Sequence, residues 1–506
     1  MLNKFRINIG LEIHAQLASR TKLFSSAPVL DDAPPNTAVD IFDCAIPGTM
    51  PVLNKECVMM ALKAGKILNC QIPKYSRFDR KHYFYPDMPM GFQITQNEMP
   101  IAKDGFFDYY LYSSFYSNQK ESKSNKNSIH QENGSRYKKS RVSIKQVQLE
   151  IDSGKTILDL KERNLIDLNR AGVGLIEIIT HPTISSSLEA VSFLEQLRIF
   201  LIHNNISKGE MHKGHYRVDA NISLINKDAP PNELGERTEV KNINSFKDIV
   251  KAIDFEVTRH VGILNRGEKV RYETRKVCED GTTIPLRDKE GEIIDYRFTA
   301  EPNLPILKIE KEWLDNISIT CEDIPHLIYI NKYGMNPKEA LEFASKSNSK
   351  HFMDIALPLN TTPLSNFFNW YTELQFICEK IKKEYPLSSE NDIKAFCFIV
   401  NLENESKITK LTAIDLLKKC LLQNEVNENE IIEIIKCNNL WRITNEGEIN
   451  YYIEKVCKKE KKLYEQTLSG KKVKHFNKLR NLIFNECNKT IQLSDLEKFL
   501  WKKLNS

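Results

Sequence analysis

The residues best suited to chemistry begin with Glu12 and His14, two positions apart near the N-terminus. Side chains two residues apart in a strand share a face and lie roughly 7 Å apart, so both can approach one cation directly or through water. Residues 6–17 alternate polar and apolar side chains, which predicts a strand with one face on a core. A half-buried strand with a solvated polar face would show the same alternation, so this stretch alone does not identify a site.

Four later strand-like stretches repeat the arrangement. Glu150 and Asp152 alternate with apolar residues, and Glu177 is the single carboxylate in a nearly continuous apolar run over residues 173–179. The other two stretches carry the following residues on one face each: Arg217, Asp219, Asn221 and Ser223, and then Arg237, Glu239 and Lys241. If the five strands share a sheet, one face would be lined by acids with Arg and Lys at its side. Carboxylates suit Mg2+, and basic groups suit the phosphates that accompany it.

Helices are expected between these strands. Asn54 is a candidate N-cap for a helix from Lys55, residues 186–189 read as a capping box, and another helix is expected from Ser245. Strands and helices thus alternate over the first 300 residues without a strict βαβ rhythm, which favours an α+β fold. Residues 78–87 mix charged and aromatic side chains before a proline, which indicates either a rigid loop beside a site or an aromatic surface staple.

Changes in composition divide the chain of 506 residues. After Pro305 strand signals become rare, and from about Glu405 short helices rich in Lys and Glu are expected. We therefore predict a catalytic domain over residues 1–310, a helical domain over 311–404 and a basic helical tail domain over 405–506. Residues 117–141 are rich in Ser, Asn, Lys and Gln, so we expect a disordered insertion there.

Several classes of protein are not indicated by the sequence. The eleven cysteines include no Cys-x-x-Cys pair and no zinc-finger spacing, which argues against a structural zinc or a disulfide scaffold and for a reducing compartment. No apolar run approaches transmembrane length, so we expect a soluble protein with no membrane partner. The sequence has no phosphate-binding P-loop, no dinucleotide fingerprint and no Gly-x-Ser-x-Gly elbow. A nucleotide would therefore need a platform of carboxylates and Mg2+.

Positive charge is concentrated at the C-terminal end. The formal net charge of the chain is +5, yet residues 451–506 hold fourteen Lys and Arg against six Asp and Glu. This density suits a phosphate backbone, although a solvated lysine-rich helical surface is the commoner explanation.

Nine motifs carry a specific resemblance to a known family. They follow one another at residues 9–14, 78–87, 149–155, 167–172, 217–222, 238–245, 273–275, 295–297 and 301–305. Their sequences include Gly-Leu-Glu-Ile-His at 10–14, Leu-Glu-Ile-Asp-Ser-Gly-Lys at 149–155 and Glu-Val-Lys-Asn at 239–242. In this order they resemble the GatB family, the B subunits of tRNA-dependent glutamyl-tRNA(Gln) amidotransferases.

The resemblance implies a glutamine synthetase-type cradle domain, a helical domain and a small tail domain that helps to hold tRNA. It implies conversion of mischarged Glu-tRNA(Gln) to Gln-tRNA(Gln): ATP phosphorylates the γ-carboxylate of the tRNA-bound glutamate, and ammonia then displaces the phosphate. ATP and Mg2+ are the expected cofactors, because both steps develop charge on phosphoryl oxygens.

The resemblance also implies roles for individual residues. Glu12, His14, Glu150 and Glu177 match the metal-binding positions, and Lys81 matches a lysine on the path of ammonia. We add Arg217 and Asp219 as candidate nucleotide contacts and Glu239 and Lys241 as candidate catalytic contacts to the acyl phosphate, beside Glu150 and Lys81. For these four additions, a structural ion pair at a strand edge is an equal alternative.

Two departures from the family pattern stand out. Many members have two adjacent acids where this chain has Glu150-Ile151, and the tail has Ser469-Gly-Lys-Lys-Val-Lys474 in place of a glycine-rich loop. The sequences of residues 42–49 and 81–85 resemble the corresponding segments of mitochondrial members more than those of bacterial ones. We therefore expect a mitochondrial location, with the bacterial cytoplasm as the alternative, although the N-terminus shows no room for a presequence.

The resemblance also implies partners, because the chain shows no amidase Ser-Ser-Lys arrangement. Ammonia would come from an amidase A subunit, and a small C subunit would brace the pair, in a heterotrimer that binds Glu-tRNA(Gln) through the basic tail. Two alternatives remain open: a small-molecule carboxylate-amine ligase of the glutamine synthetase type, and a non-catalytic scaffold that binds tRNA.

Overall fold

The computed structural model describes residues 4–112, 137–158, 163–230, 232–286, 296–319, 325–346, 349–423, 426–468 and 473–504. The chain forms two compact units, Met1–Ser347 and Asn348–Ser506. Each unit is described by itself.

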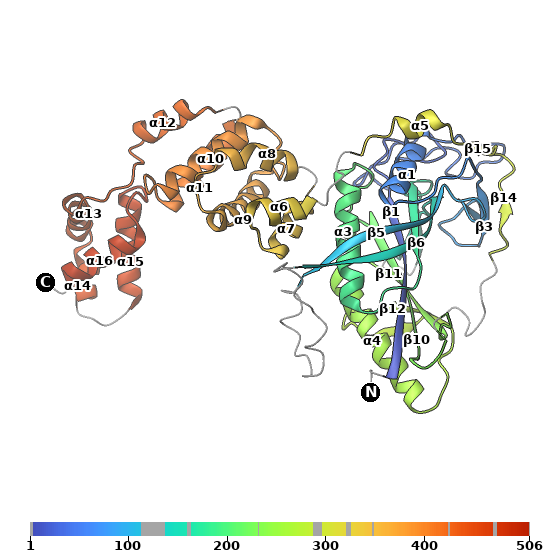
Figure 1. Cartoon of the computed structure of the whole chain (residues 1–506). Coiled ribbons are helices and arrows are strands. Elements are labelled where there is room, and N and C mark those ends of the chain that lie inside the picture. The colour runs from blue at the N-terminus through green and yellow to red at the C-terminus, as the bar shows by residue number, and fades with distance from the viewer. Residues whose placement is uncertain are drawn as a thin grey trace. The chain divides into compact units, whose positions relative to one another are not determined.

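The first unit is built on an eight-stranded sheet with the strand order β13-β12-β11-β10-β1-β9-β6-β5 (Figure 1). Its strands are β1 Phe5–Gln16, β5 Ala102–Tyr112, β6 Tyr137–Ile151, β9 Gly174–Thr180, β10 Tyr216–Asn226, β11 Arg237–Ile243, β12 Glu273–Val277 and β13 Thr283–Pro285. All neighbours pair antiparallel except β11 and β12, which are parallel. The five predicted polar strands are thus contiguous, in the order β6-β9-β1-β10-β11, which confirms that they share one sheet.

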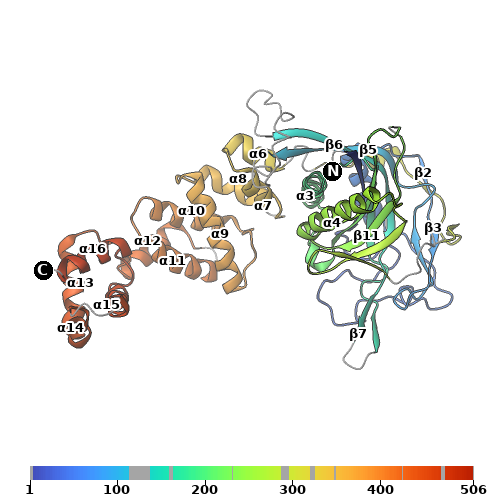
Figure 2. The same ribbon diagram turned by 90° about the horizontal axis from the view of Figure 1, so that it is seen from below.

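Helices cover the apolar face of this sheet. Ile9, Leu11 and Ile13 of β1 are buried in one core with residues of α1 Lys55–Ile67, α3 Ser187–His203 and α4 Phe246–Asn265. Figures 1 and 2 show α3 and α4 side by side along the sheet. Asn54, Ser186 and Ser245 each accept a hydrogen bond from a backbone N–H in the first turn, which confirms Asn54 as an N-cap and the three helix starts. The capping box predicted at residues 186–189 is formed only in part, because Glu189 accepts the backbone N–H of Ser185 instead of that of Ser186.

Three small sheets accompany the main one. They are formed by β14 Thr299–Ala300, β3 Asp79–His82 and β4 Phe92–Thr95; by β15 Leu307–Lys308 and β2 Tyr75–Ser76; and by β7 Lys155–Leu158 and β8 Asn164–Asp167. The prediction of a loop over residues 78–87 is wrong for residues 79–82, which are the strand β3. Their charges are paired rather than solvated: Arg80 forms an ion pair with Glu301 at 2.6 Å, and Asp79 accepts the backbone N–H of Asn97 at 3.0 Å.

The expected disordered insertion is too long at its C-terminal end. Residues 117–136 lie outside the described residues, but residues 137–141 belong to β6 and pair with β5, beginning at Tyr137 opposite Tyr112. Their polar side chains fit the strand because Arg141 binds Asp108 at 2.6 Å and lies over the ring of Phe106. Composition missed these contacts, since both partners come from another strand.

The remaining helices fall into both units. The first unit also holds α5 Lys311–Asp315, α6 Pro325–Tyr333, α7 Pro337–Ala344 and the 3-10 turn η2 Met211–Lys213; the second holds α8 Ser349–Leu359, α9 Leu364–Ile381, α10 Glu390–Asn404, α11 Lys410–Gln423, α12 Glu428–Cys437, α13 Glu446–Lys459, α14 Lys461–Leu468, α15 Val473–Glu486 and α16 Leu493–Leu504. Among these helices, none combines the length and apolarity needed to cross a lipid bilayer.

The predicted domain limits at 310 and 404 do not coincide with the division at residue 347. Helices α6 and α7 belong to the first unit because they pack on α3, where His203 Nε2 lies 2.7 Å from the carbonyl oxygen of Ala344. Within the second unit, α13 to α16 enclose their own apolar cluster, which includes Ile453, Leu479 and Leu500.

Candidate active site

The polar face of the sheet gathers His14, Glu150 and Glu177 into one cluster. They lie on β1, β6 and β9, and one ligand atom from each lies within 4.8 Å of the others. Strand register produces this proximity, because His14 stands directly opposite Glu177 and their Nε2 and Oε1 atoms are 3.7 Å apart. We call this set the first cluster.

Two glutamines orient the carboxylates of the first cluster. Gln148 donates a hydrogen bond to Glu177, and Gln93 donates to Glu150 Oε1 at 2.7 Å. The second oxygen of Glu150, Oε2, is buried and accepts no hydrogen bond from any described residue. A buried carboxylate oxygen without a donor is costly, so a cation is a suitable occupant. Sequence reasoning missed both glutamines as orienting residues, although Gln148 stands on the same strand face as Glu150.

Lys81 reaches the first cluster from β3. Its Nζ lies 3.9 Å from Glu150 Oε2 and 5.0 Å from the centre of the Tyr296 ring. Burial favours the neutral amine, but Glu150 and Glu177 outweigh it and raise the pKa of Lys81. Lys81 is therefore positively charged at neutral pH.

The pKa values of the two glutamates are raised as well, but here burial is the cause. Burial raises the pKa of Glu150, which Lys81 partly opposes. Burial likewise raises the pKa of Glu177 to about 7; Lys81 lowers it, while Glu12 and Asp219 raise it. Strongly perturbed carboxylates gathered around one lysine are typical of functional sites.

A second cluster lies next along the sheet. Glu12, Asp219 and Glu239 on β1, β10 and β11 also bring ligand atoms within 4.8 Å of one another. Glu12 faces Asp219 across the β1–β10 pair, Asn221 donates to Glu12 at 2.9 Å, and Lys241 Nζ lies 3.6 Å from Glu239. The four predicted metal ligands therefore fall into two clusters. His14, Glu150 and Glu177 lie in the first cluster, whereas Glu12 lies with Asp219 and Glu239 in the second.

Arg217 forms an ion pair beside the first cluster. Its Nη1 donates to Asp152 at 3.0 Å, and Arg170 lies 3.5 Å from the same carboxylate. Although burial favours the protonated acid, Arg217 and Arg170 together lower the pKa of Asp152. Arg217 thus forms an ion pair, which was the alternative to a nucleotide contact for this residue. Its role in nucleotide binding stays a prediction. Ile151 is buried in the apolar core, so its side chain does not line the polar face.

A cavity of about 650 Å³ opens beside the second cluster. Its lining includes Gly10, Glu12, Lys145, Ser223, Arg237 and Tyr272. The guanidinium of Arg237 lies 5.4 Å from the centre of the Tyr272 ring, so a cation and an aromatic face stand together at the wall. Both the volume and the mixture of polar groups suit a ligand of nucleotide size.

A comparison with known protein families identifies the region that contains both clusters. Residues 7–315 match the family described as the GatB/GatE catalytic domain. The chain belongs to the GatB family. Every residue of both clusters, and Lys81, falls within the matched GatB region, so the resemblance seen in the sequence is confirmed.

Relatives extend the match over most of the chain. The chain is 34% identical over 499 residues to the mitochondrial glutamyl-tRNA(Gln) amidotransferase B subunit of Danio rerio, an alignment that covers 94% of this chain and 85% of the relative. It is 32% identical to the aspartyl/glutamyl-tRNA(Asn/Gln) amidotransferase B subunit of Thermodesulfovibrio yellowstonii, with 91% of each chain covered. The human mitochondrial glutamyl-tRNA(Gln) amidotransferase B subunit is 46% identical over 307 residues, 60% of this chain and 51% of the relative.

Proposed function

We propose that this chain is the subunit of a tRNA-dependent amidotransferase that converts Glu-tRNA(Gln) to Gln-tRNA(Gln). The observation that carries the proposal is the pair of carboxylate clusters on one sheet face, each accompanied by a lysine, inside the region that matches the GatB/GatE catalytic domain. We also infer that residues 1–310 form a cradle of the glutamine synthetase type.

The reaction begins between two anions. An oxygen of the tRNA-bound glutamate γ-carboxylate attacks the terminal phosphorus of ATP, and ADP leaves. Ammonia then forms a bond to the carbonyl carbon, Cδ, of this acyl phosphate, phosphate leaves with the bonding electron pair, and the nitrogen loses a proton. The site must therefore hold negatively charged groups together and keep water from the acyl phosphate.

Mg2+ fits the two clusters. All but one of their ligand atoms are carboxylate oxygens, and Glu150 Oε2 accepts no hydrogen bond among the described residues. His14, Glu150 and Glu177 would hold one ion, and Glu12, Asp219 and Glu239 would hold another. When bound, Mg2+ neutralises charge on phosphoryl oxygens.

Lys81 and Lys241 contribute positive charge of their own. Burial lowers the pKa of Lys241, but Glu239, Tyr296 and Asp219 together outweigh it and the pKa is raised. Lys241 therefore stays protonated beside the second cluster, where it can bind the phosphates of ATP. Lys81 stands at the first cluster, where it orients Glu150 near the incoming ammonia. The nucleoside would occupy the cavity between Gly10 and Tyr272.

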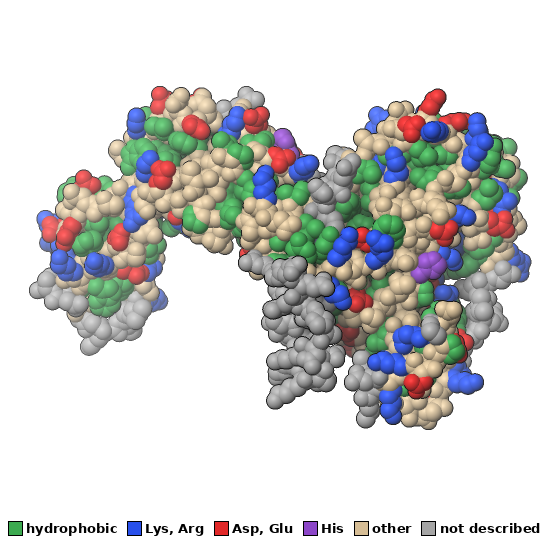
Figure 3. All heavy atoms as spheres, in the orientation of Figure 1, with side chains coloured by type: hydrophobic (Ala, Val, Ile, Leu, Met, Phe, Trp, Pro, Cys, Tyr) green, Lys and Arg blue, Asp and Glu red, His purple; other side chains and the backbone are tan. Residues whose placement is uncertain are grey.

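The tail supplies a surface that suits tRNA. Several of its cations are already paired, as Lys502 is with Glu446 and Arg480 with Glu497, and Figure 3 shows blue and red side chains intermingled there. Other cations are exposed and have no acid partner among the described residues: Lys474, Lys478 and Lys498. On the same two helices, the indole of Trp501 is 53% exposed and stacks on Phe476. Exposed aromatic rings among lysines bind unpaired bases and phosphates.

The assembly follows from the chemistry. We infer that an amidase subunit supplies ammonia, that a small third subunit steadies the pair, and that the complex works in the mitochondrion. The names of the fish and human relatives support the location. The purified chain should have no glutaminase activity, and hydrolysis of glutamine by this chain alone would refute the division of labour.

The kinase step can be tested without any nitrogen donor. The chain assembled with its amidase partner is given ATP and Glu-tRNA(Gln), and release of ADP is followed. We expect ADP release that requires aminoacylated tRNA and is lost in Glu12→Gln, whereas deacylated tRNA gives none. ADP release that is equal with deacylated tRNA, or equal in Glu12→Gln, would contradict the proposed site.

A further inference from the structure

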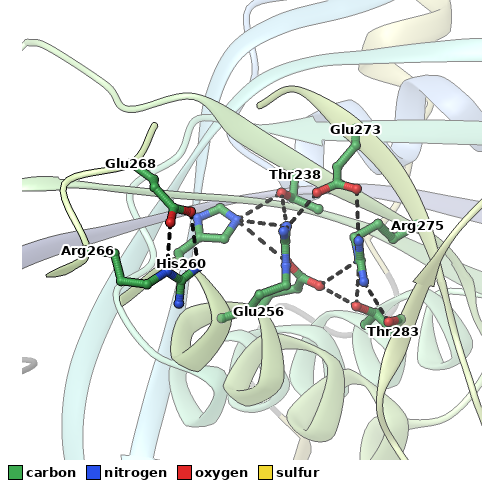
Figure 4. A network of polar contacts seen from close by, with 9 residues as sticks. Thr238, Glu256, His260, Arg266, Glu268, Glu273, Arg275 and Thr283 are labelled. Carbon is green, nitrogen blue, oxygen red and sulfur yellow. Dashed lines mark hydrogen bonds and ion pairs between the residues drawn. The ribbon is translucent and has the colours of Figure 1, made fainter. Parts of the chain in front are cut away.

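A closed ring of four charges lies under the edge of the sheet next to the second cluster. Arg259 binds both Glu256 and Glu273 at 2.8 Å, and Arg275 binds the same two carboxylates at 3.0 and 2.8 Å (Figure 4). We call these four residues the charge ring. Glu256 is fully buried and also receives a hydrogen bond from Thr283, while His260 Nε2 lies 3.5 Å away.

The charge ring joins three consecutive elements of the chain. β11, α4 and β12 form a βαβ crossover, which accounts for the parallel pairing of β11 with β12. Glu256 and Arg259 lie on α4, and Glu273 and Arg275 on β12. Arg259 also donates to Thr238 of β11 at 2.9 Å. The charge ring therefore holds β12 to both the helix and the neighbouring strand.

Strand alternation connects the charge ring to the second cluster. Between Glu273 and Arg275 lies Thr274, whose side chain points to the opposite face and stands beside Glu239 in the register of β11 and β12. Thr274 donates to Glu239 Oε2 at 3.3 Å, and Tyr272 lies 3.5 Å from the same oxygen. The other oxygen, Oε1, lies beside Lys241.

We propose that the charge ring is a positioning device for Glu239, acting through Thr274. A buried carboxylate between two guanidinium groups tolerates few arrangements, because displacement of any member leaves a buried charge unpaired. By fixing β12, the charge ring holds the hydroxyl of Thr274 where it orients the carboxylate of Glu239 toward Glu12 and Asp219. The four residues of the charge ring do not touch the reactants.

This inference rests on the proposed metal role of the second cluster, so its test measures metal binding directly. Mn2+ alone is titrated into the full chain, and free Mn2+ is followed by electron paramagnetic resonance. All variants are made in a Glu177→Gln, Asp31→Asn background, which removes a ligand from the first cluster and from the group formed by Asp31, Glu210 and His215, so that the titration reports on the second cluster. Glu273→Gln breaks the charge ring at its more exposed carboxylate, and Thr274→Val removes the donor with little change in shape.

We expect Glu273→Gln and Thr274→Val each to raise the dissociation constant for Mn2+ about 10-fold, as loss of groups that orient metal ligands does. The double variant should bind Mn2+ no more weakly than the weaker single variant, because both changes act on the same carboxylate. Glu268→Gln is the matched control: Glu268 pairs with Arg266 nearby at 2.9 Å but is exposed and outside the charge ring, so affinity should not change.

Three results would overturn the inference. First, Glu273→Gln or Thr274→Val could bind Mn2+ with the parental affinity while Glu239→Gln binds it more weakly. The second cluster would then be a metal site, but the charge ring would have a purely structural role. Additive effects in the double variant would show that the two residues act independently. Parental affinity in Glu239→Gln would remove the metal role of the second cluster itself, and with it the role of the charge ring. Thermal unfolding of each variant confirms that the chain is folded.

Discussion

Replacing Lys81 by Met should shift the pH dependence of metal binding and activity at the first cluster to higher pH. Lys81 Nζ lies 3.9 Å from Glu150 Oε2, and Lys81 lowers the pKa of both Glu150 and Glu177. Methionine keeps the length of the side chain but removes the charge. Since metal ligands must be deprotonated, a change that favours the protonated acids opposes metal binding at low pH, whereas at high pH it also removes the repulsion between Lys81 and Mg2+.

The size of this effect follows from the distance. Two unit charges about 4 Å apart interact by about 4 kcal/mol at an effective dielectric constant near 20. The Lys81 side chain is 23% exposed, so solvent screens part of this energy. We therefore expect the midpoint of the pH dependence of Mg2+-dependent activity to rise by roughly 1 to 2 pH units, less than the full Coulomb energy would give.

The sign of the pH dependence is fixed by the same contact. Without Lys81 the pKa values of Glu150 and Glu177 rise, so both acids stay protonated to higher pH and activity is recovered only on the alkaline side. The assay is ammonia-dependent formation of Gln-tRNA(Gln) at a constant concentration of free ammonia, titrated with Mg2+ between about pH 6 and 9. Lys394→Met is the control, because Lys394 pairs with Glu390 at 2.7 Å on α10, in the second unit. An unchanged pH profile in Lys81→Met would refute the reasoning.

Three further predictions concern other parts of the chain. Burial raises the pKa of Glu256, but hydrogen bonds from His260, Arg259 and Thr283 outweigh it and lower the pKa from 4.5 to about 2. The lowered pKa contributes about 3 kcal/mol to the free energy of unfolding above pH 4.5, and this contribution is lost as pH falls toward 2. Urea unfolding across that pH range should show the loss. Glu256→Gln should be less stable at neutral pH, but its stability should not show this dependence on pH. Gly172→Ala should lower the free energy of unfolding by roughly 2 to 4 kcal/mol, measured by urea, because a φ of +83° strains alanine and its Cβ would lie 2.6 Å from Asp43 Oδ1. Trp501→Ala should weaken binding of Glu-tRNA(Gln) about 10-fold in a filter-binding assay, whereas Trp501→Phe should retain most of it.

Alternation along the chain was enough to predict the strands of the site. The period of two placed Glu12, Glu150, Asp219 and Glu239 on polar strand faces, and Glu177 stood out as the single carboxylate of an apolar run; the structure has all five on one sheet. Local patterns succeeded because each strand buries one apolar face and each N-cap satisfies its own helix.

The grouping of the carboxylates was not predictable from these patterns. Which acids meet depends on strand order and register, as Glu12 opposite Asp219 and His14 opposite Glu177 show. The sequence likewise did not indicate that Arg217 neutralises Asp152, or that Gln93, far along the chain, holds Glu150. Charged residues in β3 were taken for a loop because their partners, such as Glu301, come from distant segments.

The central claim is that the kinase and transamidase chemistry resides in this chain. The most direct measurement uses the chain assembled with its amidase partner and supplied with Glu-tRNA(Gln), ATP and Mg2+. Ammonium chloride replaces glutamine, so that the glutaminase is bypassed, and the amino acid released from the tRNA is identified. We predict glutamine that requires ATP and disappears in Glu150→Gln. Glutamate left unchanged by the parental complex, although the complex still binds tRNA, would contradict the claim and favour a non-catalytic scaffold.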